Sequence, residues 1–175
     1  MQVYHIRHSH REGKNPHISK KGLTLANKIG KNLPSFDVVL SSSSVRAIET
    51  TIAMGFAVSD TINFDDAIPK VKSQPQDKNQ KGYDTFIEYS EKIQSDSRFK
   101  DYSVNLIQIL NNKLKLFENA ENVLIVSHGG IIEISTIAFL PDIDYISWGK
   151  CVDHCNGVKL VIKNGICQQG SKLDF

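Results

Sequence analysis

The chain has 175 residues, 40% of them hydrophobic, which is enough for one buried core and short for two domains. Its 21 basic and 19 acidic residues give a formal net charge of +2, which argues against the strongly basic surface of a nucleic-acid-binding protein. No apolar run has the length of a membrane span, and the first residues lack the apolar core of a signal peptide. We therefore expect a soluble, cytoplasmic protein that forms a single domain over residues 1–175 and binds neither nucleic acid nor membranes. The three cysteines, an odd number, are expected to be free thiols.

The first strand-forming run, Val3 to Ile6, ends in the pair Arg7-His8. In an open α/β sheet, the carboxyl ends of the strands border the crevice that receives ligands. A neutral imidazole is a competent nucleophile toward phosphorus, and a guanidinium is a fixed cation that matches phosphate oxygens. The pair therefore suggests phosphoryl transfer, although an Arg-His dipeptide also occurs often by chance.

A polar loop over residues 10–16 is expected to lie above the crevice and to lead into a helix that Ser19 caps. Residues 37–40 are expected to form a short strand whose core, Val38 to Leu40, is continuously apolar, as is typical of a strand buried in a parallel sheet; four serines follow directly. The next helix is expected to begin after these serines.

Arg46 lies in the first turn of this next helix, whose predicted apolar face consists of Val45, Ile48, Ile52 and Phe56. A cation in the first turn is unfavourable for the helix dipole unless an anion lies nearby. Bound phosphate would supply that anion. A carboxylate such as Glu49 is an equally good alternative.

The middle of the chain changes in composition. Residues 61–64 are expected to form a third strand, whereas residues 69–82 are almost all polar and are expected to form an exposed excursion. Helical periodicity returns around residues 86–93 and over residues 103–117, where the apolar stripe consists of Ile107, Leu110, Leu114 and Phe117. We expect these two helices to cover the sheet and a small mobile cap or lid to lie within about residues 65–100.

The clearest buried strand, residues 123–126, runs into Ser127-His128-Gly129-Gly130 and then an apolar helix over residues 131–139. Two glycines after a strand allow a tight turn and leave the N–H groups of the new helix open to an anion. The run from Gly157 to Ile162 and the turn Asn164-Gly165 indicate a final strand and hairpin. Together these elements predict an α/β fold, a three-layer sandwich with a mostly parallel central sheet flanked by helices.

The carboxyl ends of parallel strands open on one side of a sheet, so Arg7, His8, Arg46 and His128 are expected to converge. At these positions the chain resembles the histidine phosphatase superfamily, also called phosphoglycerate mutase-like. The family's Arg-His-Gly looks like Arg7-His8-Ser9, and its later His-Gly looks like His128-Gly129. Its segment of Ser, three residues, Arg-Ala, two residues and Thr is similar to residues 42–50, and its helix opening is similar to residues 18–22.

The resemblance implies a metal-independent phosphohydrolase without a cofactor. His8 would be the nucleophile and form a phosphohistidine, and Arg7, Arg46 and His128 would hold the phosphoryl oxygens. Ser9 would lie where the backbone passes the phosphate. The substrate would be a phosphorylated small molecule or a phosphoprotein, and water would release the phosphate.

Two departures from the family pattern stand out. Ser9 replaces the usual Gly and adds a hydroxyl and a Cβ near the phosphate. Lys70 aligns with the Glu that protonates the leaving group in many members. The possible substitutes are the carboxylates Asp65, Asp66, Asp84 and Glu88, each of which also fits an ordinary surface position. Without such an acid, good leaving groups are expected to be favoured, because they need little protonation.

Three alternatives remain. The first is a metal-dependent hydrolase, because four histidines lie close together near the N-terminus: His5, His8, His10 and His17. A weaker metal candidate is the group within residues 151–155, whose spacing fits no structural zinc site. A family member that binds a phosphorylated ligand without turning it over is the second alternative. A mutase is the third, and the short stretch available for a cap favours hydrolysis over it.

Overall fold

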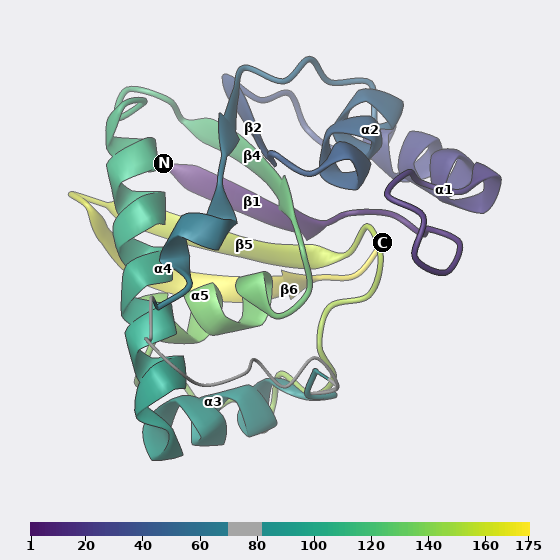
Figure 1. Ribbon diagram of the computed structural model, residues 1–175. Helices are drawn as coiled ribbons and strands as arrows, with labels where there is room; N and C mark the ends of the chain where they lie inside the picture. Colours follow the sequence, from purple (N-terminus) through teal and green to yellow (C-terminus); the bar gives the residue numbers. More distant parts are fainter. Residues whose placement is uncertain (70–81) are drawn as a thin grey trace.

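The computed structural model describes residues 1–69 and 82–175 (Figure 1). The strands in chain order are β1 (Gln2–Arg7), β2 (Val38–Ser42), β3 (Asp60–Ile62), β4 (Asn122–Ser127), β5 (Gly157–Lys163) and β6 (Ile166–Leu173). The helices are α1 (Lys20–Gly30), α2 (Val45–Ala53), α3 (Phe86–Ser95), α4 (Ser97–Lys115), α5 (Ile131–Phe139) and the short 3₁₀ helix η1 (Phe64–Ala67).

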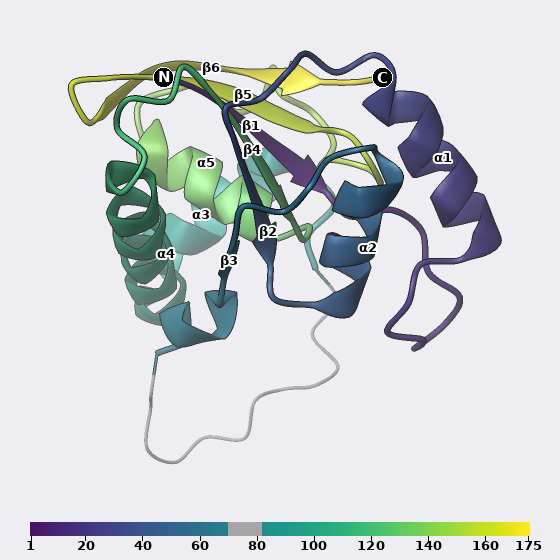
Figure 2. The same ribbon diagram turned by 90° about the horizontal axis from the view of Figure 1, so that it is seen from above.

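The strands form one sheet in the order β3-β2-β4-β1-β5-β6. The first four strands of this order run parallel, and β5 and β6 are antiparallel to their neighbours. Helices α1 and α2 cover one face, and α3, α4 and α5 cover the other (Figure 2). The predicted α/β fold, a three-layer sandwich around a mostly parallel sheet, is therefore confirmed.

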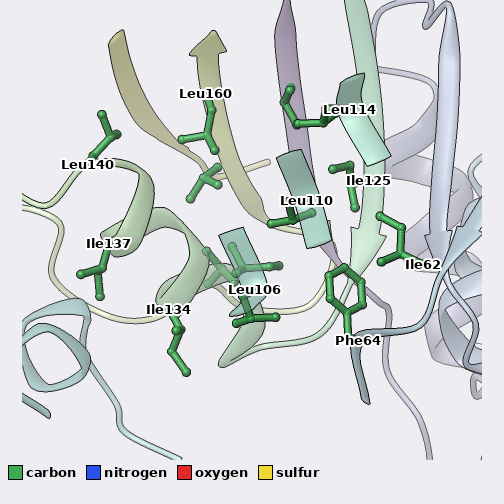
Figure 3. Close-up of a cluster of buried hydrophobic side chains, with 14 of the residues drawn as sticks. Ile62, Phe64, Leu106, Leu110, Leu114, Ile125, Ile134, Ile137, Leu140 and Leu160 are labelled. Carbon is green, nitrogen blue, oxygen red and sulfur yellow. The ribbon is translucent and has the colours of Figure 1, made fainter. Parts of the chain in front are cut away.

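The apolar runs of β2 and β4 are continuous because both faces of these strands are buried. Alternate side chains face opposite layers. Ile125 packs toward Leu106 and Leu110 of α4 (Figure 3), whereas Leu124 packs toward α1 and α2. The core thus fixes the strands whose carboxyl ends carry the predicted site.

The predicted apolar face of helix α2 is wrong. The helix buries Ala47, Thr50 and Thr51, whereas Ile52 is 61% exposed and Val45 is 43% exposed. The reason is close packing of α1 against the end of α2: a Cβ on Gly30 would lie 2.0 Å from the Met54 carbonyl oxygen. Only small side chains fit such a contact, and the large apolar ones turn outward.

Two further boundaries differ from the expected ones. The third strand ends at Ile62, and η1 begins at Phe64, in place of a strand over residues 61–64. Helix α4 begins at Ser97 and buries Ser103, Leu106, Leu110 and Leu114, so Ile107 and Phe117 are only partly buried. The predicted hairpin is confirmed: Asn164 and Gly165, between β5 and β6, have φ values of 52° and 76°.

Most of the predicted polar excursion, residues 70–81, lies outside the described residues, and the predicted cap or lid falls partly on the same stretch. All three cysteines are free. Among the described helices, none is long and apolar enough to cross a membrane.

Candidate active site

The carboxyl ends of three neighbouring strands meet at one edge of the sheet. Arg7, the last residue of β1, pairs with Ser127, the last residue of β4. Strand β2 lies on the other side of β4 and ends at Ser42. The residues that follow these ends, His8 and His128, therefore lie side by side, with their ring centroids 5.1 Å apart.

Arg46, in the first turn of α2, joins the two imidazoles. Its Nε donates to His8 Nε2 at 3.1 Å, and its Nη2 lies 3.2 Å from His128 Nδ1. Because the β2 strand leads into α2 through the serine run, the helix begins beside both histidines. Three of the predicted site residues are thus brought together by direct contacts.

His8 is held as a neutral imidazole with a defined tautomer. Its Nδ1 lies 2.7 Å from the Ser9 carbonyl oxygen, an acceptor, so Nδ1 carries the proton and Nε2 presents a lone pair toward Arg46. Burial, helped by the positive charges of Arg46 and Arg7, lowers the pKa of His8 to about 3, although the hydrogen bond to the Ser9 carbonyl raises it. An unprotonated Nε2 is the form that a nucleophile requires.

His128 is also neutral but has different partners. Its Nε2 lies 2.9 Å from the Ser42 hydroxyl and 3.3 Å from the Ser44 hydroxyl. Burial, followed by the charge of Arg46, lowers the pKa of His128 to about 4. Hydroxyl groups donate or accept, so these partners tolerate either charge state of the ring.

Arg7 provides the second guanidinium of the site. Its Nη1 donates to the Val152 carbonyl at 2.9 Å, and its buried Nε has no hydrogen-bond partner among the described residues. A Cβ on Gly129 would lie 3.2 Å from Arg7 Cζ and Nε, so the glycine makes room for the guanidinium. A buried cationic N–H without a partner is a position where an anion would be favourable.

Ser9 contacts the helices behind the site. Its hydroxyl donates to the Gly22 carbonyl at 2.7 Å, and its backbone N–H donates to Thr50 Oγ1 at 2.9 Å. Thr50 in turn donates to the Arg46 carbonyl at 2.7 Å. Ser9, which is fully buried, therefore ties the turn after β1 to both α1 and α2.

A cavity of about 690 Å³ is lined by Arg7 and Gly129, which are the chain neighbours of His8 and His128. Of the four possible substitutes for the missing acid, Asp84 lines this cavity, whereas Glu88 caps α3 and Asp66 accepts from Asn63. Lys70 lies outside the described residues. The cavity has polar side chains of both charges, among them Asp84, Lys150 and Asp153.

Some features of the site escaped prediction from the sequence. His154, considered only as part of the weak metal candidate within residues 151–155, has its ring 5.8 Å from that of His8 and stacks on His10 at 3.9 Å, between centroids. The buried carboxylate of Glu133 accepts from Gly130 N–H and from Val152 N–H, which fixes the carbonyl that Arg7 contacts. The spacing of Glu133, three residues after Gly130, was a detectable capping signal. His154 carried no such signal.

Two of the four N-terminal histidines have partners elsewhere in the fold. His5 is fully buried and contacts the Ser127 hydroxyl at 2.6 Å, and His17 pairs with Glu49 at the surface. Within residues 1–69 and 82–175, no three His, Cys, Asp or Glu side chains are placed to hold a metal ion. This geometry disfavours the metal-dependent hydrolase, because two of its proposed ligands, His5 and His17, face other parts of the fold.

Two imidazoles and two guanidiniums at the ends of parallel strands are the arrangement expected of an α/β phosphoryl-transfer protein. The family model "Histidine phosphatase superfamily (branch 1)" matches residues 4–168. The chain therefore belongs to the histidine phosphatase superfamily.

Solved structures share the fold across nearly the whole chain. Phosphoserine phosphatase from Entamoeba histolytica, in complex with 3-phosphoglyceric acid, has a TM-score of 0.69 and 16% identity, covering 99% of this chain and 97% of its own. A putative α-ribazole-5'-P phosphatase from Escherichia coli has a TM-score of 0.66 and 18% identity, covering 100% and 97%. Phosphoglycerate mutase from Thermus thermophilus has a TM-score of 0.56 and 14% identity, covering 100% and 99%. No curated relative matches the sequence.

Proposed function

We propose that this protein is a metal-independent phosphohydrolase that transfers a phosphoryl group first to His8 and then to water. The observation that carries the proposal is the state of His8: its Nε2 is unprotonated and lies 3.1 Å from the Arg46 N–H that would hold the incoming phosphate. Attack by Nε2 on phosphorus would form a phosphohistidine, and hydrolysis would restore the free imidazole.

Arg7, Arg46 and His128 would neutralise the phosphoryl oxygens. Arg46 donates to two neutral imidazoles, and Arg7 has a buried N–H with no partner among the described residues. A phosphate dianion would accept from these donors, which are already in place and need little reorganisation. Both hydrogen-bonding groups of Ser9 are engaged elsewhere, so the proposed cradle consists of His8 and these three residues.

The adjoining cavity supports a phosphorylated small molecule as substrate. Its volume of about 690 Å³ fits a metabolite-sized group, and its polar lining suits a hydrophilic one. Neighbouring structures, at low sequence identity, include a phosphoserine phosphatase and an α-ribazole phosphatase. A phosphoprotein remains the second class of substrate to be tested.

A trapping experiment tests this function. The wild-type protein is mixed with radiolabelled phosphoramidate, quenched in alkali, which preserves phosphohistidine, and digested to locate the label. We expect the label on His8, its loss in His8→Ala, and its retention in His17→Gln, a matched variant of an exposed histidine outside the site. Release of the label to water distinguishes a hydrolase from a mutase. A wild-type protein that is never labelled, yet binds phosphate, would belong to the non-catalytic alternative.

A further inference from the structure

The pair Asp153-His154 connects the proposed nucleophile with the cavity: His154 lies near His8, and Asp153 lines the cavity. The His154 ring centroid is 5.8 Å from that of His8, almost as close as the His128 ring at 5.1 Å. Asp153, the preceding residue, lines the cavity together with Arg7. A phosphorylated molecule whose phosphate lies against His8 and whose remainder lies in the cavity would place its bridging oxygen near this pair.

The contacts of His154 fix the state of its ring. Its Nδ1 lies 3.0 Å from Asp153 Oδ1, a carboxylate oxygen that also accepts from the His154 backbone N–H at 2.7 Å. A carboxylate only accepts, so Nδ1 carries the proton and Nε2 is the nitrogen that gains or loses one. The same division of roles operates where a carboxylate orients a catalytic histidine in hydrolases.

The environment of His154 suits a group that changes charge. Its side chain is only 20% exposed, and one face of the ring is covered by His10 at 3.9 Å. Burial, then Arg7 and His10, lowers the pKa of His154, whereas Asp153 raises it. A phosphate dianion held by Arg7 would offset the effect of that cation and favour the imidazolium.

We propose that His154, oriented by Asp153, exchanges the proton that the reaction requires, in the role that a glutamate fills in many family members. This inference rests on the proposed function. In the first step, His8 Nε2 forms a bond to phosphorus, the bond from phosphorus to the bridging oxygen breaks, and that oxygen takes a proton from His154 Nε2. In the second step, His154 Nε2 takes a proton from water as its oxygen attacks phosphorus, and the electron pair of the phosphorus–nitrogen bond returns to His8.

Asp84 is the competing assignment, because it also lines the cavity. The two assignments are separated by measuring kcat/KM for phenyl phosphate, a poor leaving group, and dinitrophenyl phosphate, a good one. A proton donor matters for the first substrate and hardly at all for the second. We expect His154→Gln to lower kcat/KM for phenyl phosphate by about 10²-fold, with little change for dinitrophenyl phosphate.

Further arms complete the test. Asp153→Asn is expected to shift the ratio of the two kcat/KM values in the same direction as His154→Gln but less. Asp84→Asn and His17→Gln are expected to leave this ratio unchanged. Phosphorylated His8 is expected to persist longer in His154→Gln, since the base for the second step is missing. His154→Asn serves as the second variant if the glutamine variant does not fold.

Two results would overturn the inference while leaving the proposed function in place. One is an equal loss, or no loss, for both substrates in His154→Gln and His154→Asn. The other is a leaving-group effect in Asp84→Asn but not in the His154 variants. If the wild-type protein never carries label on His8, the proposed function itself fails, and the role of His154 fails with it.

Discussion

Replacing Ser9 by Ala separates a structural role of this hydroxyl from a phosphate-binding role. Ser9 is fully buried, and its hydroxyl donates to the Gly22 carbonyl at 2.7 Å, in the first turn of α1. The variant loses this bond and leaves the carbonyl with one partner fewer in a buried place, which costs about 1–2 kcal/mol of unfolding free energy. For a chain of this length, that loss lowers Tm by roughly 2–8 °C.

Thermal unfolding followed by circular dichroism measures the stability, and kcat/KM measured in parallel reports on the site. The matched control is Ser95→Ala, which removes an exposed serine hydroxyl that donates to the Glu91 carbonyl at 2.8 Å, also within a helix. We expect its Tm to change little, because water replaces the lost partner. A large loss of kcat/KM in Ser9→Ala without a change in Tm would contradict the reasoning and place the hydroxyl on the phosphate.

Other variants test the cradle and its electrostatics. Arg46→Lys replaces the guanidinium that contacts both imidazoles by a single ammonium group. We expect kcat/KM to fall by about 10²-fold or more while Tm stays near the wild-type value. An unchanged kcat/KM would show that one positive charge suffices. Gly129→Ala places a Cβ 3.2 Å from Arg7 Cζ and is expected to shift the guanidinium. We expect phosphate affinity, measured by calorimetry, and kcat/KM, measured by steady-state kinetics, each to fall by about tenfold. Full activity would exclude Arg7 as a phosphate ligand. Acid is expected to destabilise the protein, because the pKa values of His5, His8 and His128 are lowered from 6.5 to between about 3 and about 4, so the unfolded chain binds more protons below pH 6.5. By pH 5, the free energy of unfolding falls by on the order of 2 kcal/mol for each imidazole. Urea unfolding measures this as a lower midpoint concentration. A midpoint that does not change with pH would show that these rings titrate normally.

The meeting of the strand ends at one edge of the sheet was predictable from the sequence because it depends on local patterns. The continuous apolar runs of residues 38–40 and 123–126 mark strands that are buried on both faces, and such strands run parallel with their ends on one side. The contacts of Arg46 with both histidines follow from that placement. The roles of these residues in catalysis remain predictions for the experiments above.

What the sequence did not reveal depends on contacts between distant segments. The predicted apolar face of α2 was wrong because the sequence pattern of Val45 and Ile52 carries no information on how closely α1 approaches α2 at Gly30. The role of Ser9 was hidden for a similar reason, since its acceptor, Gly22, belongs to a helix that folds back over the turn. His154 is 146 positions beyond His8 in the sequence and reaches the site only because β5 pairs with β1.

The charge states of the two central histidines fit different tasks, although both begin as neutral rings. His8 donates from Nδ1 to a backbone carbonyl, which cannot donate in return, so its neutral tautomer is fixed with the lone pair on Nε2. His128 contacts the hydroxyls of Ser42 and Ser44, which reorient to suit either state. When a phosphate dianion draws Arg46 away from His128 Nδ1, that nitrogen is able to take a proton and donate to the same anion. A proton taken up on binding would therefore go to His128. His8 Nε2 would stay unprotonated, as attack on phosphorus requires.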